Sequence, residues 1–272
     1  MALTLKKTST LILSFLSIVS NGSDFHSPRT AALGGAGHAG PLLNDAIYLN
    51  PSFSSFLPTY SLGMNYGKYK DSTNAYRGHL LNLSVQDGRS ELFQAGAGFT
   101  RREDATLIHF GAAKSFVQRF GFGLGGKLAI NNVTHLTQTD GTLAVSFIPN
   151  DSVQTALIVD NLSHEKDREV ILGTKLNIQQ MLLLYFDPHL LPGKSDTLYG
   201  HEGGIEIVAM QDLFLRMGQF QNSRIPVLNS FGKGFGLGVG WVAPKASLDY
   251  GFSRIVNPVS VNVHTLGMTI YM

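Results

Sequence analysis

The chain has 272 residues, of which 43% are hydrophobic and 15% are charged, and its formal net charge is +2. An ordinary soluble domain has about a quarter of its residues charged, and a small positive charge without a basic stripe gives no support for a nucleic-acid partner. Cysteine is absent, which excludes disulfides, thiolate metal sites and a cysteine nucleophile.

The first 22 residues have the pattern of a secretory signal peptide. Lys6 and Lys7 precede an apolar run over 11–19, and residues 20–22 (SNG) supply small side chains for a signal peptidase. An amphipathic first helix is the alternative, but the apolar run is uniform and no helical pattern follows it. We expect residues 1–22 to be a signal peptide and the protein to be exported.

Residues 23–58 differ from the rest of the chain because small residues are frequent and no strand period is present. Gly34, Gly35 and other glycines in this segment allow close packing against a neighbouring backbone. Pro51 fixes its own φ and favours an extended Asn50. The Asn50-Pro51 pair is then either a simple turn or a rigid point at which the Asn50 amide bonds to a wall or a ligand.

From Thr59 to the end, the chain shows runs with the two-residue period of β-strands. In residues 120–130 (FGFGLGGKLAI) the large apolar side chains lie on one face and the glycines on the other. Fourteen runs fall near 59–70, 77–87, 92–101, 105–116, 120–130, 142–148, 152–160, 168–178, 181–187, 202–208, 212–220, 233–242, 245–254 and 260–272. Most approach the length that a tilted strand needs to cross a bilayer, whereas no apolar stretch reaches the roughly 18 residues of a membrane-spanning helix.

The connections favour the same architecture. The odd-numbered ones are mostly long and cover 71–76, 102–104, 131–141, 161–167, 188–201, 221–232 and 255–259, whereas the even-numbered ones are tight turns such as 87–90. Outer-membrane barrels have an even number of strands, short periplasmic turns and longer outer loops. Residues 59–272 are therefore predicted to form an all-β, 14-stranded antiparallel transmembrane β-barrel in a bacterial outer membrane, in contact with its lipid.

Several stretches resemble the FadL/PorV-like outer-membrane proteins. Residues 32–36 (ALGGA), 44–46 (NDA) and 50–52 (NPS) are similar to the opening of that family, and 156–162 (ALIVDNL) and 264–268 (HTLGM) are similar to later strand ends. The resemblance implies that residues 23–58 form an N-terminal hatch inside the barrel lumen. It also implies a hatch or ligand path that includes Leu33, Gly34, Gly35, Asn50 and Pro51.

The glycine faces of the wall are where we expect the hatch to pack. Alternating glycines within 121–125 and 234–240 leave room for a backbone to approach closely. We therefore expect residues 32–40 to lie against these two stretches.

Strand phase places a small set of charged side chains toward the lumen. They are Lys127, Lys175, Glu206, Arg216, Lys245 and Asp249. These groups either pair with one another in a wall network or line a solute path, and a water-filled general porin would carry more charged rings than this.

Enzyme motifs do not occur in their proper context. Gly121, Gly123 and Gly126 match a dinucleotide-binding spacing but lie within one strand, and residues 193–195 (GKS) lack the upstream glycine of a P-loop. Residues 201–204 (HEGG) lack the second histidine of a zinc-binding helix. We expect no enzymatic activity, no cofactor and no metal.

Two classes of function remain open. Resemblance to FadL implies passage of small hydrophobic molecules across the outer membrane through a hatch-gated lumen, with a lateral exit where the wall is weak. Resemblance to PorV implies a non-catalytic scaffold or anchor for a secretion system, with a secreted or surface protein as partner. We favour transport, and the two longest predicted loops hold apolar residues for a small mouth: Leu190, Leu191, Tyr199, Ile225, Val227 and Leu228.

Overall fold

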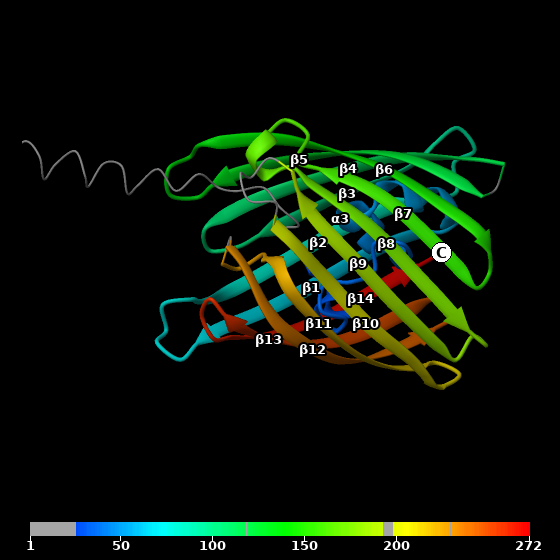
Figure 1. The fold of residues 1–272 in the computed structure, drawn as a ribbon. Coiled ribbons are helices and arrows are strands. Elements are labelled where there is room, and N and C mark those ends of the chain that lie inside the picture. Colours follow the sequence, from blue (N-terminus) through cyan, green and yellow to red (C-terminus); the bar gives the residue numbers. More distant parts are fainter. Residues whose placement is uncertain (1–25, 118, 193–197, 229) are drawn as a thin grey trace, which may run out of the picture.

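The computed structural model describes residues 26–117, 119–192, 198–228 and 230–272, and the expected signal peptide at 1–22 lies outside these residues. Within the described residues fourteen strands form a closed antiparallel barrel (Figure 1), which confirms the predicted fold class. The strands are β1 (Tyr60–Asp71), β2 (Arg77–Asp87), β3 (Gln94–Arg101), β4 (Ala105–Phe116), β5 (Phe120–Asn131), β6 (Thr137–Asn150), β7 (Val153–Asp160), β8 (Glu169–Ile178), β9 (Leu182–Leu191), β10 (Leu198–Met210), β11 (Leu213–Ile225), β12 (Ser230–Ala243), β13 (Ala246–Asn257) and β14 (Val261–Tyr271).

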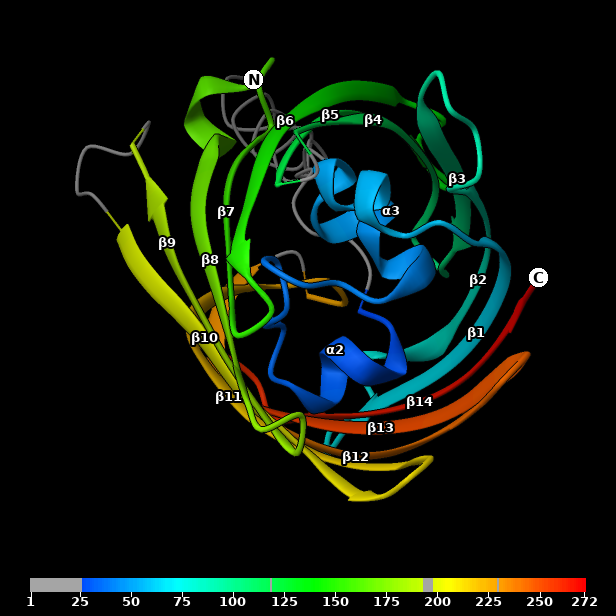
Figure 2. The same cartoon turned by 90° about the vertical axis from the view of Figure 1, so that its right-hand side faces the viewer.

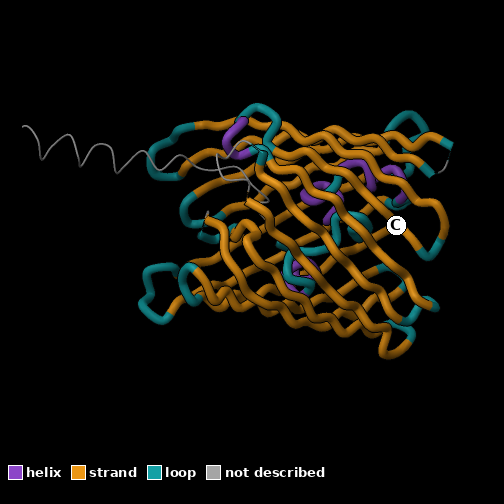
Figure 3. Tube along the Cα trace, viewed as in Figure 1, coloured by secondary structure: helices purple, strands orange, loops and turns teal. Residues whose placement is uncertain are grey.

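The barrel closes because its first and last strands pair with each other. β1 and β14 run antiparallel in register from Ser61–Tyr271 to Asp71–Val261, and every other strand pairs with its neighbours in sequence (Figure 3). A closed sheet has no free edge, so its backbone groups find partners within the barrel even where lipid surrounds it.

Side-chain alternation gives the wall two unlike surfaces. On β5, Phe120, Phe122 and Leu124 are exposed on the outside, whereas Gly121 and Gly123 are buried on the inside. Most positions on the other strands follow the same rule, with leucine, methionine and aromatic residues outside, although Tyr69, Phe220 and Ile255 belong to an apolar cluster on the inner side. An apolar outer surface around a polar interior is what a barrel in a lipid bilayer requires.

The two ends of the barrel are distinguished by their connections. One end, here called the turn end, carries the start of β1, the end of β14 and turns such as 151–152, 211–212 and 244–245, although its connection 88–93 is longer. The opposite end, the loop end, carries the 161–168 connection. The loops predicted at 131–141, 188–201 and 221–232 prove shorter, because the flanking strands continue past the apolar stretches that mark them in sequence.

The N-terminal segment lies inside the barrel (Figure 2). It contains α2 (Pro28–Ala32), two 3₁₀ turns, η1 (Leu43–Asp45) and η2 (Pro51–Phe56), and between them α3 (Ala46–Leu49). α2 packs against β12 and β13, whereas η2 packs against β4 and β5. None of the described helices is long and apolar enough to span a membrane.

Candidate functional site

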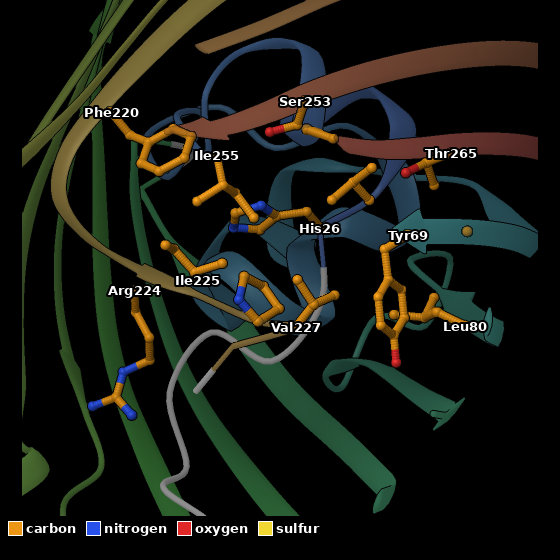
Figure 4. Close-up of a pocket in the computed structure, with 14 residues that line it drawn as sticks. His26, Tyr69, Leu80, Phe220, Arg224, Ile225, Val227, Ser253, Ile255 and Thr265 are labelled. Atoms are coloured by element: carbon orange, nitrogen blue, oxygen red, sulfur yellow. The ribbon is translucent and has the colours of Figure 1, made fainter. Parts of the chain in front are cut away.

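An apolar cavity lies inside the barrel near the loop end. Tyr69 on β1, Phe220 and Ile225 on β11 and Ile255 on β13 contribute to its lining, and the ring of His26 projects among them (Figure 4). The first four belong to one buried apolar cluster. Burial lowers the pKa of His26, so its imidazole is neutral at neutral pH. The cavity is therefore a favourable environment for an apolar molecule.

This cavity is small in the present structure, with a volume of about 40 Å³. One water molecule needs about 10–15 Å³, and an engineered apolar cavity of about 150 Å³ binds benzene. The cavity has room for a few water-sized groups and is too small for an aromatic ring. A ring-sized ligand would enter only after the lining side chains or the N-terminal segment had moved.

A second cavity, of about 280 Å³, opens toward the turn end and is charged. Arg29, Asp45, Arg216 and Asp249 are among its lining residues. Burial raises the pKa of Asp45 to about 6, even though its carboxylate accepts a hydrogen bond from Ser27 Oγ at 2.9 Å. This cavity is therefore more polar than the apolar cavity near the loop end.

Helix α2 lies between the two cavities. Ala31, near its end, lines the apolar cavity, whereas Pro28, at its start, lines the charged one. On β1, Tyr69 lines the apolar cavity and Asn65 lines the charged one. A molecule that crosses the lumen from one end to the other must therefore displace α2 or pass around it.

A buried ionic network holds α2 to the wall. Arg29 Nε donates to Glu206 Oε2 at 3.1 Å, and Arg29 Nη2 donates to Tyr185 Oη at 2.6 Å. Arg216 also donates to Glu206 and, through Nη1, to Asp249. Three of the charges expected in the lumen thus form one network with a residue of the N-terminal segment, which favours wall pairing over isolated charges along a solute path.

The turn after α2 needs glycine for its backbone and for space. Leu33 is fully buried and fills the space above Gly218, where a Cβ would overlap the Leu33 backbone. Gly34 and Gly35 have φ angles of 68° and 90°, which L side chains rarely adopt. A Cβ at Gly35 would also overlap the Glu202 carboxylate. These residues hold the segment against β10 and β11.

A histidine–carboxylate cluster follows along the same wall and consists of His38, Glu169, Asp187, His189 and Glu202. His38 Nδ1 lies 2.9 Å from Asp187 Oδ2, and His189 Nδ1 lies 2.7 Å from Glu169 Oε1. Glu202 Oε2 lies 3.8 Å from His38 Nδ1 and 3.5 Å from His189 Nε2. Among the described residues, His38, Asp187 and Glu202 form the one group of three or more side chains with the spacing of metal ligands.

Asn50 serves both roles proposed for it. Its side-chain oxygen caps η2 by accepting a hydrogen bond from Ser52 N at 3.1 Å, which is the turn role. Its Nδ2 donates to Ser146 Oγ on β6 at 2.9 Å, which is a bond to the wall. Pro51 occupies the first position of η2, where its missing N–H has no consequence.

The three lysines expected in the lumen have different surroundings. Lys127 on β5 is buried and forms an ion pair with Asp160 on β7. Lys175 is partly buried, and its Nζ lies 5.8 Å from the ring centroid of Tyr185. Lys245 is exposed in the turn between β12 and β13, so it lies outside the lumen wall. The strand phase that placed it inside does not apply in a turn.

The wall glycines contact two different parts of the N-terminal segment. On β12, Gly236 and Gly238 leave no room for a Cβ because Ala31 and Ala32 lie against them. On β5, the glycines of 121–125 instead face residues 51–56. Contact with residues 32–40 therefore occurs on the β12 side but not on the β5 side, which η2 covers.

The pairing of residues between the wall strands β8 and β9 is interrupted. Pairing runs from Val170–Leu190 to Ile171–His189 and resumes only at Thr174–Phe186. Pro188 lies within the gap and has no N–H to donate. Thr174 N–H points to the Asp187 carboxylate instead, at 3.3 Å. The interruption lies beside His38 and Ala39, which pack against Gly173.

The residues of the rejected enzyme motifs lie in different parts of the chain, on β5 and β10. Gly121, Gly123 and Gly126 lie within β5, and residues 193–195 fall outside the described residues. His201 and Glu202 are neighbours on β10, and only Glu202 is buried among the lumen side chains. Of the residues expected at the apolar mouth, Ile225 and Val227 line the cavity, whereas Leu190 and Tyr199 are exposed.

Several residues of the site were not anticipated from sequence. Asp187 and His189 lie at and beyond the end of a run that was predicted to stop at residue 187, and Arg29 and His38 lie in a segment without any period. Asp187 already lies on the inner face by phase, and extending the alternation of β9 by four residues would have added His189 to the same face.

Comparisons with known proteins agree with the fold. No family model matches the chain, and no curated protein matches it. Among solved structures it is similar to the "TodX deltaS2S3 mutant monoaromatic hydrocarbon channel", with a TM-score of 0.65, 12% identity and coverage of 90% of this chain and 98% of the other. It is also similar to the Pseudomonas putida toluene transporter TodX, with a TM-score of 0.60, 12% identity and coverage of 92% and 98%.

A Pseudomonas aeruginosa FadL homologue is similar as well, with a TM-score of 0.63, 11% identity and coverage of 92% of this chain and 99% of the other. Likeness at such low identity is a likeness of fold. The chain thus has a FadL-type fold, that of a 14-stranded outer-membrane β-barrel.

Proposed function

We propose that the protein passes small hydrophobic molecules across the outer membrane, with the N-terminal segment as a hatch. The observation that carries the proposal is the apolar cavity near the loop end, which is closed on its inner side by α2. In this arrangement the loop end faces outward, and an apolar solute enters from that side. The role is transport and not catalysis.

Two further observations support a hydrophobic solute. The cavity lining is dominated by one apolar cluster that includes Phe220, Ile225 and Ile255, and burying an apolar surface there gains about 25 cal/mol per Å². Proteins of the same fold are described as a toluene transporter and a monoaromatic hydrocarbon channel. We infer that a monoaromatic hydrocarbon is the solute class, which requires the closed cavity to widen first.

The hatch would open by displacement of the N-terminal segment. Arg29 ties α2 to Glu206 and Tyr185, and Gly34 and Gly35 provide a backbone that follows the wall closely. We infer that the solute then leaves laterally at the interruption between β8 and β9, where hydrogen bonds of the wall are already missing. The lateral route brings an apolar molecule directly to lipid.

Transport is tested by measuring the initial rate of radiolabelled toluene uptake in bacterial cells that have an outer membrane, with and without the protein. We expect faster uptake with the protein, and a folded barrel is verified by its heat-modifiable migration on gels. Equal uptake in both strains would contradict transport and favour the scaffold.

Hatch movement is tested by a cross-link, which is convenient because the chain has no cysteine. Ser52 Oγ on η2 lies 2.7 Å from Ser146 Oγ on β6, so Ser52→Cys with Ser146→Cys places two sulfur atoms close enough to join η2 to β6. We expect uptake to fall on oxidation and to recover with a reducing agent. The two single-cysteine variants are the controls, and uptake unaffected by a verified cross-link would rule out a hatch movement that withdraws η2 from β6.

A further inference from the structure

The histidine–carboxylate cluster has a donor set that the proposed transport does not use. We propose that Glu202, with His38 and Asp187 on one side and His189 on the other, binds one divalent transition-metal ion of the zinc class inside the barrel. Imidazole nitrogen and carboxylate oxygen are ligands that zinc accepts. The residues are far apart in sequence, so they do not form a contiguous zinc-binding motif.

The distances suit a shared ion. Glu202 Oε2 is the common point, 3.5 Å from His189 Nε2 and 3.8 Å from His38 Nδ1. Two ligands of a tetrahedral zinc, each about 2.0–2.1 Å from the metal, lie roughly 3.4 Å apart. The ligand atoms of His38, Asp187 and Glu202 all lie within 4.8 Å of one another, and His189 Nε2 approaches the same Glu202 oxygen. Asp187 Oδ2 lies 2.9 Å from His38 Nδ1 and also accepts hydrogen bonds from the backbone N–H groups of Gly37 and His38, so a bound ion would replace the hydrogen bond between His38 Nδ1 and Asp187.

Two of the donor atoms lack hydrogen bonds in the described structure. Glu202 Oε2 and His189 Nε2 are buried and have no hydrogen-bond partner, although they face each other. A buried polar atom without a hydrogen bond costs roughly 1–3 kcal/mol. A cation bound between them would satisfy both atoms at once, which makes this pair an independent indication of a ligand.

The surrounding groups orient the donors as a second ligand shell would. His189 Nδ1 lies 2.7 Å from Glu169 Oε1, which leaves Nε2 directed at Glu202. Ser223 Oγ donates to Glu202 Oε1 and so leaves Oε2 for the ion. Carboxylate partners of this kind fix the ring orientation of metal-binding histidines and raise their basicity.

A bound ion would tie the N-terminal segment to the wall. His38 belongs to the segment, whereas Asp187 and His189 lie on β9 and Glu202 lies on β10. The ion would sit beside the interruption between β8 and β9. The site requires only the geometry of the closed barrel, so it stands whether or not hydrophobic molecules pass through the lumen.

The test is a titration of the full mature chain, refolded in detergent and freed of metal, with Zn²⁺ alone and with Co²⁺ alone. We expect one tightly bound ion per chain by elemental analysis, and visible Co²⁺ absorption bands typical of four-coordinate nitrogen and oxygen ligands. Glu202→Gln and His189→Gln should each weaken Zn²⁺ binding at least about 10-fold, because even second-shell changes weaken it about 10- to 100-fold.

The matched control is His164→Gln. His164 also pairs with a carboxylate, Asp140, but it is partly exposed in the 161–168 connection. This variant should bind Zn²⁺ like the parent protein, and heat-modifiable migration should show that all variants remain folded. A folded parent barrel without stoichiometric Zn²⁺ would overturn the site and leave hydrogen-bonded histidine–carboxylate pairs in its place. Equal affinity of the parent and the folded Glu202→Gln and His189→Gln variants would also overturn it.

Discussion

The two cavities on either side of α2 offer opposite environments to a molecule in the lumen. The cavity near the loop end is lined mainly by apolar side chains such as Phe220 and Ile255, whereas the turn-end cavity has Arg29, Arg216 and Asp249 at its surface. An apolar solute gains free energy by leaving water for the first cavity. It gains less by moving on into the second, because charged side chains are part of that cavity's lining.

This difference separates entry from exit. An apolar cavity near the loop end explains how a hydrophobic molecule could be captured, but a charged cavity is a poor route toward the turn end. The interruption between β8 and β9 lies near the depth of the apolar cavity, because Phe220 pairs with Glu202 on β10 and Glu202 pairs with Asp187 on β9. A lateral route therefore avoids the charged cavity altogether.

The largest loss of stability is expected from Glu206→Gln, which removes a charge from the ionic network beside the charged cavity. Glu206 accepts hydrogen bonds from both Arg29 and Arg216 and is almost fully buried. Removing one partner of a buried ion pair costs about 3–5 kcal/mol, because the other charge remains buried without compensation. Urea unfolding in lipid vesicles should show this loss. Exposed Glu165→Gln should change the free energy of unfolding by less than about 0.5 kcal/mol, and an equal loss in both variants would mean that the network does not stabilise the barrel.

Ile255→Ala changes the lining of the apolar cavity near the loop end. We expect a loss of about 2–5 kcal/mol in the free energy of unfolding, together with tighter toluene binding, because the 40 Å³ cavity becomes larger. Calorimetric titration with toluene measures the second effect. Leu248→Ala on the same strand is the control, since Leu248 is exposed on the outer surface. Weaker toluene binding by a folded Ile255→Ala barrel would contradict the assignment of the cavity.

Much of this architecture is readable from the sequence because a barrel in lipid obeys a strict period. Alternation located all fourteen strands, and runs such as 120–130 already distinguish the outer face from the inner one. Strand ends were less predictable, since β6 and β11 continue as polar ribbons beyond their apolar stretches and β9 continues past Pro188. Lys245 illustrates the same limit, because phase loses its meaning within a turn.

The site was harder to predict because it depends on contacts between segments far apart in sequence. Glu206 and Arg216 were placed in the lumen by phase, but their partner Arg29 lies 177 residues from Glu206 in a segment without periodicity. His38 and Glu202 likewise meet only after the barrel has closed around the N-terminal segment. Strand phase identifies which side chains face inward, and the path of the enclosed segment decides which of them meet.

Asp45 allows the charged cavity to be probed by pH. Its pKa is about 6 in the folded state and 3.8 in the reference state, so the folded barrel binds a proton more tightly than the unfolded chain. Its stabilising contribution is therefore complete below about pH 4 and is lost as the pH rises through about 6, by at most about 3 kcal/mol. Asp45→Asn should remove this part of the pH dependence, measured by thermal unfolding between pH 3 and 8. Exposed Asp151→Asn is the control, and an unchanged profile in Asp45→Asn would assign the dependence to other groups.

The smallest change in stability, but the most direct test of the exit, is expected from Pro188→Val. Valine supplies an N–H within the gap in the β8–β9 ladder and suits a strand, so one added hydrogen bond should stabilise the barrel by about 1 kcal/mol. If apolar molecules leave at this point, the repaired wall should slow toluene uptake while binding in the apolar cavity is unchanged. Pro244→Val, in an exposed turn at the other end of the wall, should alter neither. Normal uptake through a barrel with a demonstrably closed β8–β9 ladder would shift the exit to the turn end, and α2 would then have to deliver an apolar molecule into a charged cavity.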